Sequence, residues 1–203
     1  VEQQDMLSIH RVRARLVKNR TALANEIRGL LLEFGIIIPQ GINKIVDKLT
    51  AVLDSDQLSG ISYQTFSDLK EEYITNDKRV KELENRLKIL SSQCSLYKRL
   101  QEIPGIGLIT GTALIASIGN ASCFKNGRQL ASWLGLVPRQ NSSGGKTKLL
   151  GISKRGDVYL RSLLVQGARA ILNAKLRYIS KKDQIHANCS KFTEWICNLS
   201  ERC

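Results

Sequence analysis

The chain has 203 residues, enough for one or two domains with a substantial hydrophobic core. It carries 31 Lys and Arg against 18 Asp and Glu, a net charge of +13, which indicates nucleic acid or an anionic membrane as partner. No apolar run reaches the length of a membrane span, so nucleic acid is favoured and no membrane is expected.

The five cysteines are scattered and include no Cys-x-x-Cys pair, so we interpret them as free thiols in a reducing compartment. His186, Cys189 and Cys197 could be taken for a zinc site, but their spacing matches no zinc-finger motif. We expect no metal site in this chain and no signal peptide. Because the chain starts with Val and enters helical sequence at once, we expect it to be a fragment.

Residues 1–60 are predicted to form an N-terminal pair of helices. Apolar residues recur at helical spacing through residues 1–35, and Gly35 predicts the C-terminal end of that helix. A second helix is predicted over residues 43–53, followed by a turn. Six cations decorate the first helix against four acids, which indicates either a solvated face or contact with a nucleic-acid backbone. The six are Arg11, Arg13, Arg15, Lys18, Arg20 and Arg28.

The clearest pattern lies in residues 61–99. Seam residues alternate spacings of three and four from Phe66 to Tyr97, and this heptad pattern predicts a coiled coil. Asn76 is the only strongly polar seam position and can fix register. The seam could be met by a second copy of the chain, which we favour, or by the helix of residues 1–35 folding back antiparallel. A long single helix packed on a globular domain is the remaining alternative.

Residues 100–119 follow the helix-hairpin-helix pattern, in which an apolar residue and Pro-Gly-Ile-Gly precede a helix of small and apolar residues. Gly105 and Gly107 permit the tight turn, and free amides at the start of the next helix can bind a phosphate. Such a contact is independent of base sequence. A plain αα-corner is the alternative.

The stretch from Gly135 to Arg161 holds five of the fifteen glycines and the adjacent Ser142 and Ser143. It reads as a loop between a short amphipathic helix ahead of it and a longer helix over residues 155–174. Asp157 is the only acid between residues 139 and 169, against seven cations. These are Arg139, Lys146, Lys148, Lys154, Arg155, Arg161 and Arg169. The pattern indicates a serine presented to a phosphodiester, or else a mobile surface turn.

Four motifs in this order carry a resemblance: IPGIGLITGTALIASIG, FKNGRQLASWLGLVPR, SSGGK and GISKRGDVYLRSLLVQGAR. They resemble the C-terminal domain of the insertion-sequence one-ten family of transposases. That family has a DEDD RuvC-like N-terminal domain, is related to the Piv invertase and includes the bridge-RNA-guided recombinases. Residues 2–36 also look like the helical segment that follows the RuvC-like domain in this family.

The resemblance implies DNA transposition and recombination in a bacterial cytoplasm, near the nucleoid. The family's nucleophilic serine directly precedes glycine after a GLxPR turn, and Ser143 holds that place, with Ser142 as its neighbour. By similarity, Ser143 attacks a DNA phosphodiester and forms a phosphoserine link that needs no ATP for rejoining. Cations must then stabilise the charge on the phosphoryl oxygens. The implied DNA-binding residues are Gly105, Gly107, Arg139, Lys146, Lys148, Lys154, Arg155 and Arg161. A Ser-His-Asp hydrolase is disfavoured because His10 and His186 are read as lying in remote polar surroundings.

The resemblance also implies what this chain lacks. The family pairs its serine domain with an upstream carboxylate quartet that binds divalent metal, and residues 1–203 contain no such quartet, so Mg²⁺ is expected only with that missing domain. The family's closing helix also lacks a counterpart after one predicted helix at 192–199. We therefore expect a transposase remnant or an excised piece, with a guide RNA among the partners of the intact family.

The expected fold is all-α: a helical segment (1–60), a coiled coil (61–99), a helical serine domain with its helix-hairpin-helix (100–178) and a truncated tail (179–203). The expected function is recombination through Ser143, with DNA and a second copy of the chain as partners. A non-catalytic dimeric DNA-binding module derived from a transposase is the first alternative. A structural coiled-coil adaptor is the second.

Overall fold

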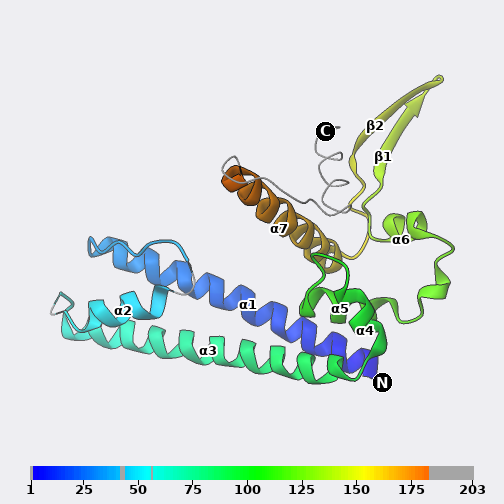
Figure 1. Cartoon of the computed structure of the whole chain (residues 1–203). Coiled ribbons are helices and arrows are strands. Elements are labelled where there is room, and N and C mark those ends of the chain that lie inside the picture. Colours follow the sequence, from blue (N-terminus) through cyan, green and yellow to red (C-terminus); the bar gives the residue numbers. More distant parts are fainter. Residues whose placement is uncertain (1, 42–43, 56, 183–203) are drawn as a thin grey trace. The chain divides into compact units, whose positions relative to one another are not determined.

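The computed structural model describes residues 2–41, 44–55 and 57–182. In these ranges the chain forms seven α-helices and a single two-stranded sheet, which confirms the predicted all-α class. The chain divides into two compact units, Val1–Leu90 and Ser91–Cys203, whose elements are labelled in Figure 1. None of the helices in these ranges combines the length and the apolar character that crossing a membrane requires.

The first unit is a helical hairpin. α1 (Glu2–Glu33) and α3 (Gly60–Ser92) lie side by side, and the shorter α2 (Ile45–Leu53) follows the connection from α1 (Figure 1). Gly35 adopts a φ of 76° just after α1, a left-handed conformation that ends helices and favours glycine. The predicted C-cap is therefore confirmed.

Two ion pairs show that α1 and α3 run antiparallel. The Arg13 guanidinium lies 2.6 Å from the Glu84 carboxylate, and the Arg20 guanidinium pairs with the Asp77 carboxylate. Moving seven residues forward along α1 corresponds to moving seven residues back along α3. The two helices therefore face each other with a heptad period, as the sequence pattern predicts for a coiled coil.

The heptad seam of α3 is covered by the same chain. Phe66, Tyr73, Val80 and Leu87, which recur every seven residues, are all at most 3% exposed. Phe66 and Tyr73 join a core whose other buried members come from α1, α2 and the connection: Leu23, Ala24, Ile27, Leu31, Ile38, Ile45 and Leu49. Of the alternatives for the seam, the structure shows the antiparallel fold-back. Burial of these residues does not require a second copy, and self-association stays an expectation.

The predicted coil does not continue as one helix to Tyr97. α3 ends at Ser92, Cys94 has an extended backbone, and α4 begins at Ser95. The sequence across this break is Ser-Ser-Gln-Cys-Ser, and serine competes for backbone hydrogen bonds outside helices. Local helix propensity therefore overrides the apolar spacing at this point.

Half of the α1 cations are engaged inside the unit. Besides Arg13 and Arg20, Arg28 donates a hydrogen bond of 2.9 Å to the carbonyl of Gly41. These contacts favour the reading of α1 as a structural helix with a solvated face over a helix that grips a nucleic-acid backbone.

His10 does not lie in the polar surroundings expected from the sequence. Its side chain is only 2% exposed within the hairpin. Burial and the nearby Arg13 charge lower the pKa of His10 to about 4, so the imidazole is neutral at pH 7. The residue belongs to the packing of the first unit.

The second unit packs short helices against one long helix. Its elements in chain order are α4 (Ser95–Gln101), α5 (Leu108–Ile118), α6 (Gly127–Trp133), β1 (Pro138–Ser143), β2 (Lys146–Ile152) and α7 (Val158–Lys182). α5 packs on both α4 and α7. The core centres on Ala113, Leu114, Leu134 and Leu160. The predicted tail helix at 192–199 lies outside the residues that the structure describes.

The stretch predicted as a loop forms a β-hairpin. β1 and β2 pair antiparallel, and Figure 1 shows the two strands extending away from the helices of their unit. Gly144 and Gly145 form the two-residue turn with φ values of 56° and 77°. Hairpin turns of the I′ type need positive φ at both central residues, which explains the two glycines.

The buried heptad positions generate a stability prediction. Leu87 is fully buried on α3, whereas Ile89 on the same helix is 66% exposed. Leu87→Ala should lower the free energy of unfolding by about 2–4 kcal/mol, because it removes buried methyl groups and leaves a cavity. Ile89→Ala should change it by less than about 0.5 kcal/mol. Urea unfolding of both variants measures the difference, and equal effects would contradict the antiparallel hairpin.

Candidate nucleic-acid interface

Positive charge is concentrated in the second unit. Residues 91–203 hold 17 of the 31 Lys and Arg but only 5 of the 18 acids, whereas residues 1–90 hold 14 cations and 13 acids. The first unit is therefore nearly neutral, and almost the whole net charge lies on the second. A fixed excess of this kind attracts polyanions.

The register of the β-hairpin decides which side chains share a face. Ser143 pairs with Lys146, and Asn141 pairs with Lys148. Residues directly opposite in an antiparallel pair point to the same side, with Cβ atoms about 4.5–5.5 Å apart. One face of the hairpin therefore carries Ser143 together with Lys146 and Lys148. Arg139 lies where the register shifts between Pro138 and Gln140, so the pairing does not assign it to this face.

The other face of the hairpin is different in character. It carries Ser142, Gln140 and the apolar Leu149, which pairs with Gln140 and is 64% exposed. The Ser142 hydroxyl accepts a hydrogen bond of 2.8 Å from the Gln140 amide. The two adjacent serines are thus separated by the strand pleat, and only Ser143 lies on the cationic face.

Lys154 and Arg155 lie at the base of the hairpin. The backbone of Lys154 has a φ of 57°, and its amide donates to the carbonyl of Gly135 at 3.0 Å. Both side chains are exposed. A lysine held in the left-handed region carries strain that the surrounding loop must offset, a feature found often at functional sites.

The structure does not bring these two cations next to the hairpin tip. β1 rises about 3.3 Å per residue, so Ser143 lies roughly 17 Å from the base at Pro138. That length corresponds to about five base-pair steps of B-DNA. Of the expected cations, Lys146 and Lys148 are therefore the ones close to Ser143, and Lys154 and Arg155 would meet a more distant part of a bound strand.

Arg161 is an expected DNA-binding cation whose side chain points inward. Its side chain is 8% exposed, and the guanidinium donates a 3.0 Å hydrogen bond to the carbonyl of Leu134. That carbonyl ends α6, where helix carbonyls lack intrahelical partners. Arg161 therefore ties the end of α6 to the first turn of α7. The sequence places it among the cations because spacing alone does not show which way it points.

The lone acid of this region is also used by the fold. The Asp157 carboxylate accepts a 2.9 Å hydrogen bond from the amide of Leu160, so Asp157 caps the start of α7. Among the residues with described placement, no three His, Cys, Asp or Glu side chains gather where they could hold a metal ion.

The two glycines of the predicted helix-hairpin-helix differ in their surroundings. Gly107 is the N-cap of α5, has open space where a Cβ would stand, and leaves the first amides of α5 without a side-chain cap. A Cβ on Gly105 would lie 2.7 Å from Ile171 and 2.9 Å from the carbonyl oxygen of Gly167. Gly105 therefore holds the turn against α7, and Gly107 is the one that can approach a phosphate.

Comparison with known proteins shows which proteins the chain resembles. Residues 97–184 match the transposase IS116/IS110/IS902 family. The chain is 41% identical, over its full length, to the transposase for insertion sequence element IS1111A of Coxiella burnetii. It is 45% identical over 84% of its length to a probable family 20 transposase of Pseudomonas aeruginosa, and 37% identical over 96% to the transposase for insertion sequence element IS1328 of Yersinia enterocolitica.

The segment that resembles this family domain, residues 97–184, makes up less than half of the chain. The chain spans about half the length of the curated relatives that it matches, between 52% and 55% of these three. The family domain begins within α4 and includes the corner, the hairpin and α7. It therefore contains both the cationic face and the open N-terminus of α5.

The sequence contained a signal for the two strands of this segment. Gly144-Gly145 is a two-residue hairpin turn, and the residues after it alternate between Lys146, Lys148 and more apolar positions. Read as a flexible loop, the stretch distinguishes Ser142 from Ser143 only through the resemblance to the family motif. Read as a hairpin, it separates them by one step of the strand.

The corner between α4 and α5 can be tested by substitution of its glycines. Gly105→Ala should destabilise the fold by about 1–3 kcal/mol, because the backbone is left-handed and the new methyl group would collide with α7. Gly107→Ala should be nearly neutral, since nothing lies within 4 Å of the added Cβ. Thermal unfolding of the two variants measures this contrast. A loss of stability confined to Gly107→Ala would show that the corner packs differently.

Proposed function

We propose that this chain is the DNA-binding and strand-joining part of an insertion-sequence transposase, with Ser143 as the nucleophile. The observation that carries the proposal is the cross-strand pairing that places Lys146 beside Ser143 on an exposed cationic face. The similarity to transposases supports DNA as the substrate. Because Ser143 lies at the tip of an exposed hairpin, it can reach a phosphodiester without the helices of the unit having to surround the DNA.

In the proposed reaction each phosphorus–oxygen bond that breaks is replaced by a new one, so the phosphate remains a diester throughout. The Ser143 Oγ attacks phosphorus, a bond from phosphorus to a deoxyribose oxygen breaks, and the proton lost by the serine balances the one taken up by the leaving hydroxyl. A DNA hydroxyl later attacks the same phosphorus and releases the serine, so the strand is rejoined without ATP. Lys146 and Lys148 stabilise the charge that develops on the non-bridging oxygens.

The resemblance implies a divalent metal held by a carboxylate quartet. The described residues offer no such cluster, so no step is assigned to a metal here. We infer that the acids come from the half of the relatives that this chain does not match. The chain would then be a partial copy, and its own activity would require that other half.

A non-catalytic DNA-binding module is the second candidate function. It is favoured by the same basic unit together with the lack of a carboxylate cluster among the described residues. Both functions predict DNA binding, and only the first predicts a covalent link. A guide RNA and a second copy of the chain are further proposed partners, and the basic second unit would suit an RNA as well as DNA.

DNA binding should depend strongly on salt. With about five exposed cations in contact with phosphates, the slope of log K against log salt should be about −4 to −5, a loss of a few hundredfold between 50 and 200 mM salt. Lys146→Gln with Lys148→Gln should make the slope shallower by about 2. Lys78→Gln, an exposed change on α3, is the matched control and should leave the slope unchanged. Fluorescence anisotropy with a random duplex measures it, and salt-independent binding would remove the proposal.

The serine is tested in a chain that supplies the missing half. We expect this chain, joined to the part of its Coxiella burnetii relative that it does not cover, to trap labelled DNA in a denaturation-resistant complex. Ser143→Ala should abolish the complex and leave DNA affinity nearly unchanged, whereas Ser142→Ala should only reduce it. This chain alone should bind DNA without forming the link. Peptide mapping identifies the linked residue, and a link elsewhere than Ser143 would refute the assignment.

A further inference from the structure

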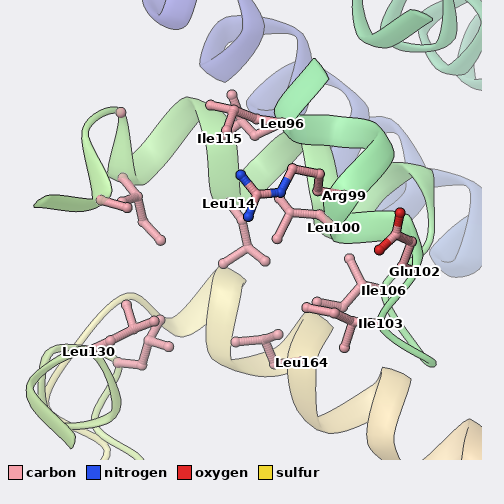
Figure 2. Close-up of a pocket in the computed structure, with 14 residues that line it drawn as sticks. Leu96, Arg99, Leu100, Glu102, Ile103, Ile106, Leu114, Ile115, Leu130 and Leu164 are labelled. Carbon is pink, nitrogen blue, oxygen red and sulfur yellow. The ribbon is translucent and has the colours of Figure 1, made fainter. Parts of the chain in front are cut away.

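The second unit contains an apolar groove that the proposed chemistry does not use. It has a volume of about 600 Å³ and lies among α4, the turn after it, α5, α6 and α7. Figure 2 shows Leu100, Ile106, Leu114 and Leu164 directed into the space from these elements. The volume falls in the range of ligand pockets.

The groove is open and has few polar groups. Leu96 and Ile103 at its edge are 51% and 47% exposed. Arg99 and Glu102 are its charged lining residues, and both are exposed (Figure 2). Contiguous apolar surface of this kind marks a contact with apolar side chains, not with the phosphates that the rest of the unit attracts. A groove of this type commonly receives one face of an amphipathic helix.

The sequence supplies a matching segment in residues 192–199, beyond the residues that the structure describes. Phe192, Trp195, Ile196 and Leu199 stand at positions i, i+3, i+4 and i+7. This spacing is the one with which a helix presents apolar anchors to a groove.

The connecting chain is long enough to reach. The groove includes Leu164, and α7 continues to Lys182, so the end of α7 lies about 27 Å beyond that residue at 1.5 Å per residue. The ten steps from Lys182 to Phe192 can span up to about 33–36 Å when extended. The segment can therefore return along α7 to the groove of its own chain.

Charge also favours this occupant. The described part of the second unit, residues 91–182, holds 15 cations and 2 acids, whereas residues 183–203 hold 2 cations and 3 acids. The segment is thus the least basic part of a strongly basic unit, and the two attract each other.

We propose that residues 192–199 occupy this groove in their own chain, with Trp195 and Ile196 as the central anchors. The segment then closes the apolar surface between α4, α5 and α7 and completes the core of the family domain. This assignment does not depend on the chemistry at Ser143.

Trp195 reports on the groove directly. The chain has two tryptophans, so Trp133→Phe leaves Trp195 as the sole emitter and keeps a ring against Phe124. In this background Trp195 should show blue-shifted emission and weak quenching by acrylamide. Ile196→Glu should expose it and speed chymotrypsin cleavage of the segment at least about tenfold, which corresponds to about 1.4 kcal/mol of docking. Cys197→Glu, on the opposite side of the same helical pattern, is the matched control.

Substitutions in the lining of the groove give a second test. The lining residues chosen are about half exposed, so a charge at these positions should not unfold the unit. Leu96→Glu and Ile103→Glu should release Trp195 as Ile196→Glu does. Leu176→Glu, which changes a residue on α7 that is 62% exposed and outside the groove, should not. Circular dichroism confirms that each variant remains helical.

Light scattering separates the possible occupants. A protected Trp195 in a monomer, released by the groove variants and not by the controls, supports the proposal. A Trp195 protected only in a dimer would assign the groove to the segment of a second copy and overturn it. Emission and cleavage that are equal in all variants would also overturn it.

Discussion

Gly105 and Gly167 approach so closely that a Cβ on Gly167 would lie 2.3 Å from the carbonyl oxygen of Gly105. This contact holds the turn between α4 and α5 on the middle of α7, and much of the second unit depends on it. Residues on both sides of this corner in the sequence line the apolar groove, and the N-terminus of α5, which follows the corner, has no side-chain cap. The close approach of one pair of glycines therefore shapes the corner that separates a hydrophobic surface from an uncapped helix N-terminus.

Elements with strong periodicity could be predicted from the sequence. The heptads of α3 and the cap at Gly35 follow local rules, and the antiparallel partner in α1 was among the alternatives. What decided among those alternatives was the pairing of Arg13 with Glu84 and of Arg20 with Asp77, which is non-local. Spacing also could not show that Arg161 points inward, because its partner, the Leu134 carbonyl, lies 27 residues away.

The candidate site, too, could be predicted only in part from the sequence. Composition identified the basic segment and the family motifs pointed to Ser143, but the strands around it went unrecognised because polar residues dominate β1. Strand pairing is what selects among the cations, placing Lys146 beside Ser143 and leaving Lys154 and Arg155 at the far end of the hairpin. A flexible loop does not assign side chains to defined faces. A stretch interpreted as a loop therefore gives no basis for choosing which nearby cations lie beside Ser143.

The hairpin that carries Ser143 has two strands, both of which are edges. An isolated ribbon of this kind is only marginally stable in water, since few of its side chains are buried and half of its backbone groups face solvent. Its opening free energy is therefore low compared with that of the helices, and amide hydrogens along β1 should exchange early. Under the proposal that Ser143 is the nucleophile, its side chain becomes rigid only where DNA or another surface holds the ribbon. The ordering of the strand is then part of target recognition, and a serine without a substrate stays poorly positioned to attack one.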